Sequence, residues 1–85
     1  MTTSVTVNIV GGTEQENTTA VSIGNVRWGK NGTANFGAAQ NVAGGNQTLT
    51  VYKTTQPTQL SNTVNVQGAA MTANITVNTN DISVN

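Results

Sequence analysis

Apolar and polar residues alternate one for one along most of this chain, which is the period of a β-strand with one buried and one exposed face. The alternation is clearest near the N-terminus, where Val5, Val7 and Ile9 are separated by serine, threonine and asparagine. No segment has the spacing of an amphipathic helix, and β-branched residues outnumber helix formers. The pattern predicts seven short strands, at about residues 3–10, 19–28, 33–37, 47–53, 62–67, 71–78 and 82–85.

Turn signals separate these predicted strands. Gly11-Gly12 and Gly44-Gly45 are glycine pairs, and the only proline, Pro57, lies between two predicted strands. Short strands with a turn signal about every ten residues predict an all-β fold. We expect a small antiparallel β-sandwich or barrel of about six to seven strands, forming a single domain over residues 1–85. A β-solenoid would need a fixed repeat period, and none is visible.

The segment 25–36 holds the only tryptophan, the only phenylalanine and two of the three basic residues. It also contains Asn31-Gly32, a strong hairpin signal because both central residues of a type I′ turn need a positive φ. The sequence therefore predicts a hairpin that turns at Asn31-Gly32 and carries Trp28 and Phe36 on its two strands. The small-residue segment 38–46 is predicted to be a loop.

The direction of the Trp28 ring depends on Gly24. Val21 and Ile23 occupy odd positions, whereas Val26 and Trp28 occupy even positions, so the alternation changes phase at Gly24. A glycine inside a strand often marks a β-bulge, and a bulge here would return Trp28 to the buried face. Without a bulge, the ring would point to solvent.

The composition predicts that the chain associates with copies of itself. A domain of 85 residues buries only about two thirds of its unfolded surface, so its core alone gives marginal stability. There is no cysteine for a disulfide, no histidine for a metal site, and only two leucines. Association is the remaining source of stabilisation, and we expect a homo-oligomer or a larger protein assembly.

Charged residues are few, and they cancel. Three basic residues face three acidic residues, namely Arg27, Lys30, Lys53, Glu14, Glu16 and Asp81. A neutral chain does not attract nucleic acid or an anionic membrane, so neither is expected as a partner. With so little charge to keep copies apart, the surface suits an assembled subunit, although a small lectin-like domain with a polar, uncharged surface would look similar.

The sequence also gives an expectation about location. The N-terminal segment lacks the basic and apolar regions of a signal peptide, and no run approaches the roughly 18 apolar residues of a membrane helix. We expect a chain that is made in the cytoplasm, or one that begins at a mature N-terminus. Its expected destination is a virion or another extracellular particle.

The chain has few residues of the types that catalyse reactions or bind metals. Without histidine or cysteine, the common general base and the thiol nucleophile are missing. Glu14 and Glu16 could form a carboxylate pair, or a hard-cation site with the amide oxygens of Gln15 and Asn17, but a solvated loop is the simpler interpretation. We therefore predict no enzyme, no cofactor and no metal.

Two functional hypotheses remain. The first is a non-enzymatic structural subunit that self-assembles or coats a larger assembly, such as a capsid decoration, tail or fibre protein of a virion. The second is a small lectin, in which an aromatic ring covers the apolar face of a sugar and polar neighbours bind its hydroxyl groups. The residues predicted to bind a glycan in that case are Arg27, Trp28, Lys30, Asn31, Asn35 and Tyr52. The competing interpretation makes Trp28 the centre of the core, and we favour it because the chain has few other large residues to fill a core.

Overall fold

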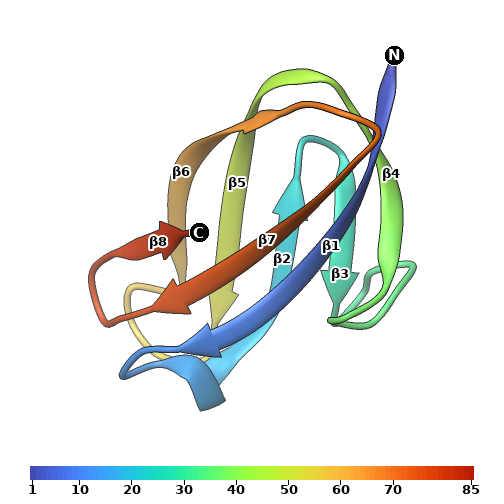
Figure 1. The fold of residues 1–85 in the computed structure, drawn as a ribbon. Helices are drawn as coiled ribbons and strands as arrows, with labels where there is room; N and C mark the ends of the chain where they lie inside the picture. The colour runs from blue at the N-terminus through green and yellow to red at the C-terminus, as the bar shows by residue number, and fades with distance from the viewer.

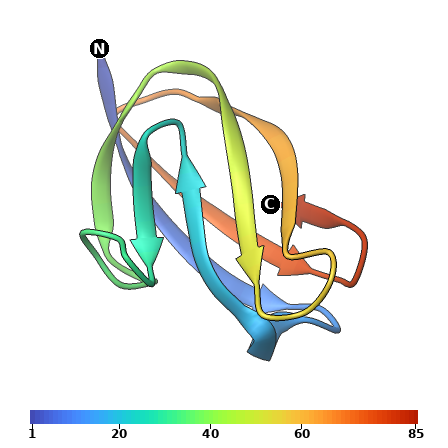
Figure 2. The same cartoon turned by 180° about the vertical axis from the view of Figure 1, so that it is seen from behind.

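The computed structural model describes all 85 residues as two four-stranded β-sheets packed face to face (Figures 1 and 2). We call the sheet with strand order β4-β1-β7-β8 sheet I, and the sheet with strand order β3-β2-β5-β6 sheet II. The strands are β1 (Thr2–Gly11), β2 (Thr18–Ile23), β3 (Val26–Gly29), β4 (Ala39–Ala43), β5 (Gly45–Lys53), β6 (Gln59–Val66), β7 (Ala70–Val77) and β8 (Ile82–Val84). A single 3-10 turn, η1 (Gln15–Asn17), joins β1 to β2. The predicted all-β sandwich is confirmed, with eight strands.

Five of the predicted strands are present close to their predicted positions, as β1, β5, β6, β7 and β8. These strands largely alternate apolar and polar residues, and most of the apolar positions face the core, although Val10 of β1 is exposed. All neighbouring strands run antiparallel except β1 and β7, which are parallel. Between β1 and β7 the chain passes through both sheets, which supplies the long connection that a parallel pairing requires.

The predicted strand at 19–28 is in fact two strands, β2 and β3, joined by a turn at Gly24-Asn25. Gly24 has a φ of 60°, and Ile23 pairs with Val26 across the turn. The expected burial of Trp28 is confirmed, but a turn and not a bulge at Gly24 produces it. Residues that oppose each other across a two-residue turn, such as Ile23 and Val26, have side chains on the same face of the sheet. The apolar residues therefore change from odd to even positions at Gly24 although their side chains stay on one face.

The hairpin predicted at Asn31-Gly32 is also wrong. The turn is centred one residue earlier, because the Gly32 N–H donates to the Gly29 carbonyl at 2.9 Å. Of its two central residues, Lys30 and Asn31, only Asn31 has a positive φ, of 63°. A type I′ turn would need two such residues, whereas one at the second central position fits a type II turn. No strand forms at 33–37, where the chain instead loops across to sheet I.

The loop predicted at 38–46 contains a strand. β4 pairs with β1 in sheet I, and only Val42 of its five residues is buried. Alanine, glutamine and asparagine at the other positions give no alternation that could distinguish this strand from a loop. The segment 39–43 is thus a strand because it pairs with β1, and not because its own sequence has a strand pattern.

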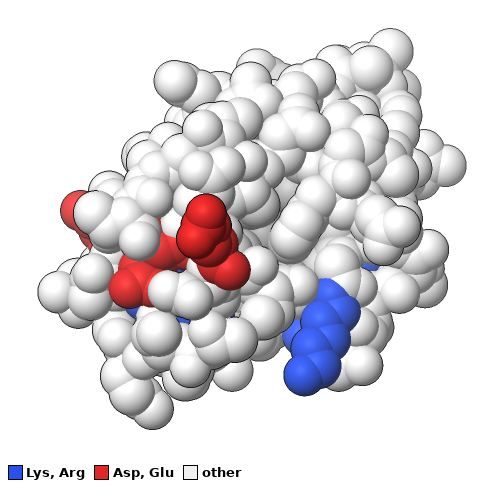
Figure 3. Space-filling view, turned by 90° about the horizontal axis from the view of Figure 1, so that it is seen from below, with Lys and Arg blue, Asp and Glu red and all other residues white.

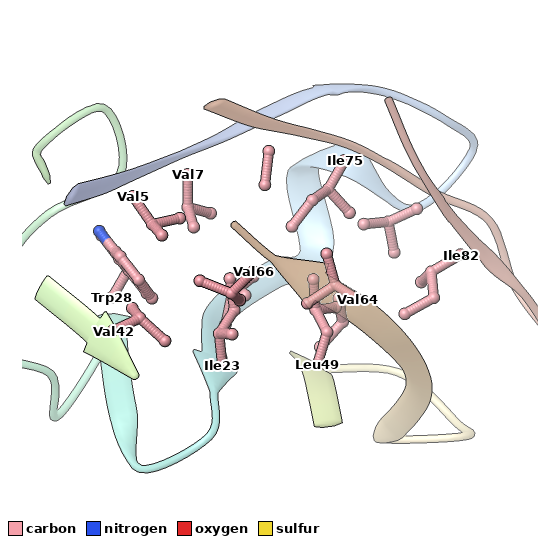
Figure 4. Packing of buried hydrophobic residues seen from close by; sticks show 14 residues of the cluster. Val5, Val7, Ile23, Trp28, Val42, Leu49, Val64, Val66, Ile75 and Ile82 are labelled. Carbon is pink, nitrogen blue, oxygen red and sulfur yellow. The ribbon is translucent and has the colours of Figure 1, made fainter. Parts of the chain in front are cut away.

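The core lies between the sheets and consists of 14 buried residues, most of them valine or isoleucine. Trp28 is its largest member and is 0% exposed. It pairs with Val21 on the inner face of sheet II, and its ring lies beside Val5 and Val42 of sheet I (Figure 4). Its indole N–H donates to the Ala38 carbonyl at 2.8 Å, so the one polar atom of the ring is satisfied.

Candidate functional site

The structure separates the residues that the sequence grouped into a sugar site. Trp28 is buried in the core, so its ring has no face that a sugar could cover. The inclusion of Trp28 in that site is therefore wrong, because its opposed partner Val21 directs it inward. Lys30, Asn31 and Asn35 lie exposed in the loop between β3 and β4.

Arg27 and Tyr52 do come together, on the outer face of sheet II. The Arg27 guanidinium carbon lies 4.2 Å from the centre of the Tyr52 ring, a cation–π contact. The Arg27 Nε–H donates to the Lys30 carbonyl at 2.9 Å, which fixes the direction of the side chain. Ala20, which pairs with Tyr52 on the strand between them, is fully buried although it points away from the core. Arg27 of β3 therefore reaches across β2 to Tyr52 of β5, and its guanidinium covers one face of the tyrosine ring.

A second polar cluster joins the loops at the end of the sandwich shown in Figure 3, where acidic side chains gather on one side of a largely uncharged surface. The Glu14 carboxylate accepts hydrogen bonds from the Thr55 hydroxyl at 2.7 Å and the Asn17 amide at 2.8 Å. These two bonds, with a smaller contribution from the Lys53 charge, hold the pKa of Glu14 below its ordinary value of 4.5. Glu14 thereby ties the β1–β2 loop to the β5–β6 loop.

Lys53 has a structural place in the same cluster. Its side chain is only 5% exposed, and its Nζ donates to the Thr79 carbonyl at 2.7 Å. Lys53 has the same orientation in β5 as Leu49 and Val51, so the strand period does place it inward. No group of three metal-ligating acidic, histidine or cysteine side chains occurs anywhere in the molecule.

At the opposite end of the sandwich is an open hollow of about 560 Å³. No charged side chain lines it, and its buried hydroxyl, that of Thr3, already donates to the Gly68 carbonyl at 2.8 Å. The hollow is bounded by Met1, Thr2, Thr3, Gly44, Val66, Gln67, Gly68 and Ala69. It offers no converging polar groups that would orient a ligand.

The edges of the two sheets differ in how well they are protected. β3 is covered, because the Arg27 carbonyl accepts from the Thr33 N–H and from the Gln40 side chain, and the Gly29 N–H donates to Ala34. β4 has five residues and β8 has three. β6 is an edge strand of eight residues, and it contains neither a charged residue nor a proline. It lies at the same side of the sandwich as β8, opposite β3 and β4 (Figure 1).

The ladder geometry shows which backbone groups of β6 are free. The Gly24 N–H donates to the Thr48 carbonyl, so Thr48 of β5 directs its backbone groups toward β2. Thr48 is opposed by Thr63, so these two residues form a non-hydrogen-bonded pair. Backbone direction alternates along a strand, which leaves four residues of β6 with N–H and C=O groups pointing away from β5: Gln59, Ser61, Thr63 and Asn65.

One of these free groups has a local partner. The Thr63 N–H has no acceptor on a neighbouring strand and donates instead to the Asn62 side-chain oxygen at 2.9 Å. This bond agrees with the direction assigned from the ladder. β6 therefore presents an uncharged row of backbone donors and acceptors, in which only the Thr63 N–H has a local partner. The sequence could not give this signal before the strand order was known.

No helix in the structure combines the length and the apolar character needed to span a bilayer. Comparison with protein-family models, with curated proteins and with solved structures finds no match to this chain.

Proposed function

We propose that this protein is a non-enzymatic structural subunit that assembles into a homo-oligomer or coats a larger particle, such as a virion in which it would be a decoration, tail or fibre protein. The observation that carries the proposal is the β6 edge, with eight residues, no charge and no proline. Natural sheets protect such edges with charges, prolines, bulges or covering loops, because an unprotected edge pairs with other chains. In this molecule β3 has a covering loop and β6 has no such protection.

The outer faces of the sheets support the same function. On sheet I, threonine and asparagine of β1 lie beside threonine and asparagine of β7, and the Asn8 amide donates to Asn74 at 3.1 Å. Hydroxyl and amide groups can be buried in an interface if they are hydrogen-bonded, without the larger cost of desolvating charges. A surface of this kind favours contact with other protein surfaces.

Carbohydrate binding remains a second candidate, with the Arg27–Tyr52 pair as its centre. Tyr52 is half-buried, and its hydroxyl has no partner within the protein. However, the guanidinium already occupies one face of the ring, and the tryptophan that would have formed the main platform lies in the core. The geometry therefore favours assembly over sugar binding.

Light scattering coupled to size-exclusion chromatography tests the proposal. A structural subunit should elute, without any added ligand, at a multiple of the 8.7 kDa chain mass, and dilution should shift the distribution toward smaller species. A single species of monomer mass at every concentration would contradict it. A glycan array tests the second candidate, with Tyr52→Ala as the control that should abolish any signal.

A further inference from the structure

We propose that the partner of β6 is β6 of a second copy, paired antiparallel about a two-fold axis at Asn62, so that sheet II continues across the interface as one eight-stranded sheet. The inference rests on the proposed function, since it names the contact through which the subunit would assemble.

The directions of the backbone groups select the register. Only residues with outward-pointing groups can form the new hydrogen-bonded pairs, and these are Gln59, Ser61, Thr63 and Asn65. Centring the axis on Asn62 opposes Gln59 with Asn65 and Ser61 with Thr63, so every outward residue meets another. About eight interchain hydrogen bonds result, because each hydrogen-bonded pair exchanges two. Moving the axis to Ser61 or Thr63 leaves one of these residues without a strand partner in each copy.

The side chains are compatible with the same register. On the inner side, Leu60, which is half-buried in one copy, would lie opposite Val64 of the other. This contact places two apolar side chains together at the rim of the core. On the outer side only hydroxyl and amide side chains meet, and no like charges are opposed. A strand pairing with its own copy must avoid placing like charges opposite each other, and β6 has none to place.

Asn62 has a particular part in this interface. In one copy its side chain accepts the Thr63 N–H, the group at the middle of the free edge. In the pair, that N–H donates instead to the partner's Ser61 carbonyl. The two Asn62 side chains then face each other at the axis and can bond as an amide pair. The Asn62 side chain thus supplies the Thr63 N–H with an acceptor before assembly, and pairing of the two strands then frees that side chain.

Disulfide trapping tests the register directly, and the chain contains no cysteine that would interfere. In Asn62→Cys the two thiols would lie on opposed residues of a non-hydrogen-bonded pair, with Cα atoms about 4.5 Å apart, within the range that a disulfide spans. In Ser61→Cys the two cysteines would be diagonal neighbours, offset by two residues and about 7–8 Å apart, which is beyond the usual reach of a disulfide. Mild oxidation should yield a covalent dimer of Asn62→Cys and not of Ser61→Cys.

A charge swap tests the same contact without cross-linking. Ser61 and Thr63 are exposed, so Ser61→Lys/Thr63→Lys should fold normally, yet it opposes lysine to lysine in both halves of the interface. This variant should lose the dimer and elute at monomer mass. Mixing it with Ser61→Glu/Thr63→Glu should restore a dimer containing one copy of each, which shows that both variants are folded.

The outcomes separate the inference from the function on which it rests. A wild-type oligomer that persists in the double-lysine variant, and in which Asn62→Cys does not cross-link, would overturn the β6 pairing while leaving assembly intact. A wild-type chain that is monomeric throughout would overturn both. Equal cross-linking of the two cysteine variants would overturn the register centred on Asn62.

Discussion

At the scale of single residues, Trp28 is the side chain on which the core depends most. It contacts both sheets, and no other aromatic ring lies fully within the core. Trp28→Ala should lower the free energy of unfolding by about 3–5 kcal/mol, the usual loss for truncating a buried aromatic side chain. For a small domain this approaches the whole stability, so the variant should be largely unfolded by circular dichroism.

A milder variant distinguishes packing from hydrogen bonding at this position. Trp28→Phe retains an aromatic ring but leaves the Ala38 carbonyl without its donor. The expected loss, about 1–3 kcal/mol, should be smaller than that of Trp28→Ala and measurable by urea denaturation. The wild-type tryptophan emission should be blue-shifted and protected from quenchers. A red-shifted emission would contradict the buried ring.

Glu14 makes stability depend on pH in a direction that can be derived. Hydrogen bonds from Thr55 and Asn17 lower its pKa in the folded chain below the ordinary value of 4.5. The folded state therefore favours the ionised form, and the resulting stability is fully present above about pH 4.5 and is lost as the pH falls toward the folded-state pKa. Melting temperatures should accordingly decrease below that pH.

Matched amide variants assign this pH dependence to one carboxylate. Glu14→Gln should have a lower melting temperature than wild type at neutral pH and a flatter profile below pH 4.5, because its amide does not titrate. Glu16→Gln, two residues away and exposed, should keep the wild-type profile. An unchanged acid slope in Glu14→Gln would show that another group is responsible.

At the scale of elements, the loop after β3 owes its course to Gly32. A Cβ atom there would lie 2.5 Å from the Arg27 carbonyl oxygen and 3.1 Å from the Trp28 carbonyl carbon, both backbone atoms that cannot move independently. Gly32→Ala should therefore destabilise the chain by about 1–3 kcal/mol, the range for locally strained backbone.

Gly11→Ala provides the comparison, because no atom lies within 4 Å of the added Cβ and the residue has no positive φ. Thermal unfolding of the two alanine variants should separate them, with Gly11→Ala close to wild type. Equal effects would mean that the space around Gly32 is larger than its neighbours indicate.

The sequence predicted a strand correctly where the residues of that strand alternate between apolar and polar side chains. β1, β5 and β7 have valine or isoleucine at alternate positions, and one buried face requires that period. The segment 24–43 lacked such a signal. There a two-residue turn changed the phase as a bulge would, and β4 is a strand only because β1 lies beside it.

At the scale of the whole molecule, the candidate sites depended on contacts that no local pattern contains. Arg27 and Tyr52 were predicted as site residues, but their stacking follows from the register across β2. The burial of Trp28 was expected, but the strand pairing that turns the ring inward and excludes it from a sugar site was not. Likewise, β6 was predicted as a strand, but its position at an edge became visible only from the order of strands in sheet II.

The two edge strands of sheet II, β3 and β6, are unequally protected, and this limits how many subunits can be joined through the sheet. The loop 30–38 covers β3, so each molecule has one long edge available for extension and is, in the language of polymer growth, monovalent. A subunit with one such edge ends a growing assembly as soon as it joins it. A two-fold contact uses the same edge of both subunits, so it forms a closed dimer. Growth beyond a pair by this route would need a second reactive edge, which removing the loop from β3 would create. Filaments appearing only in such a variant would identify the loop as the terminator that keeps sheet extension finite.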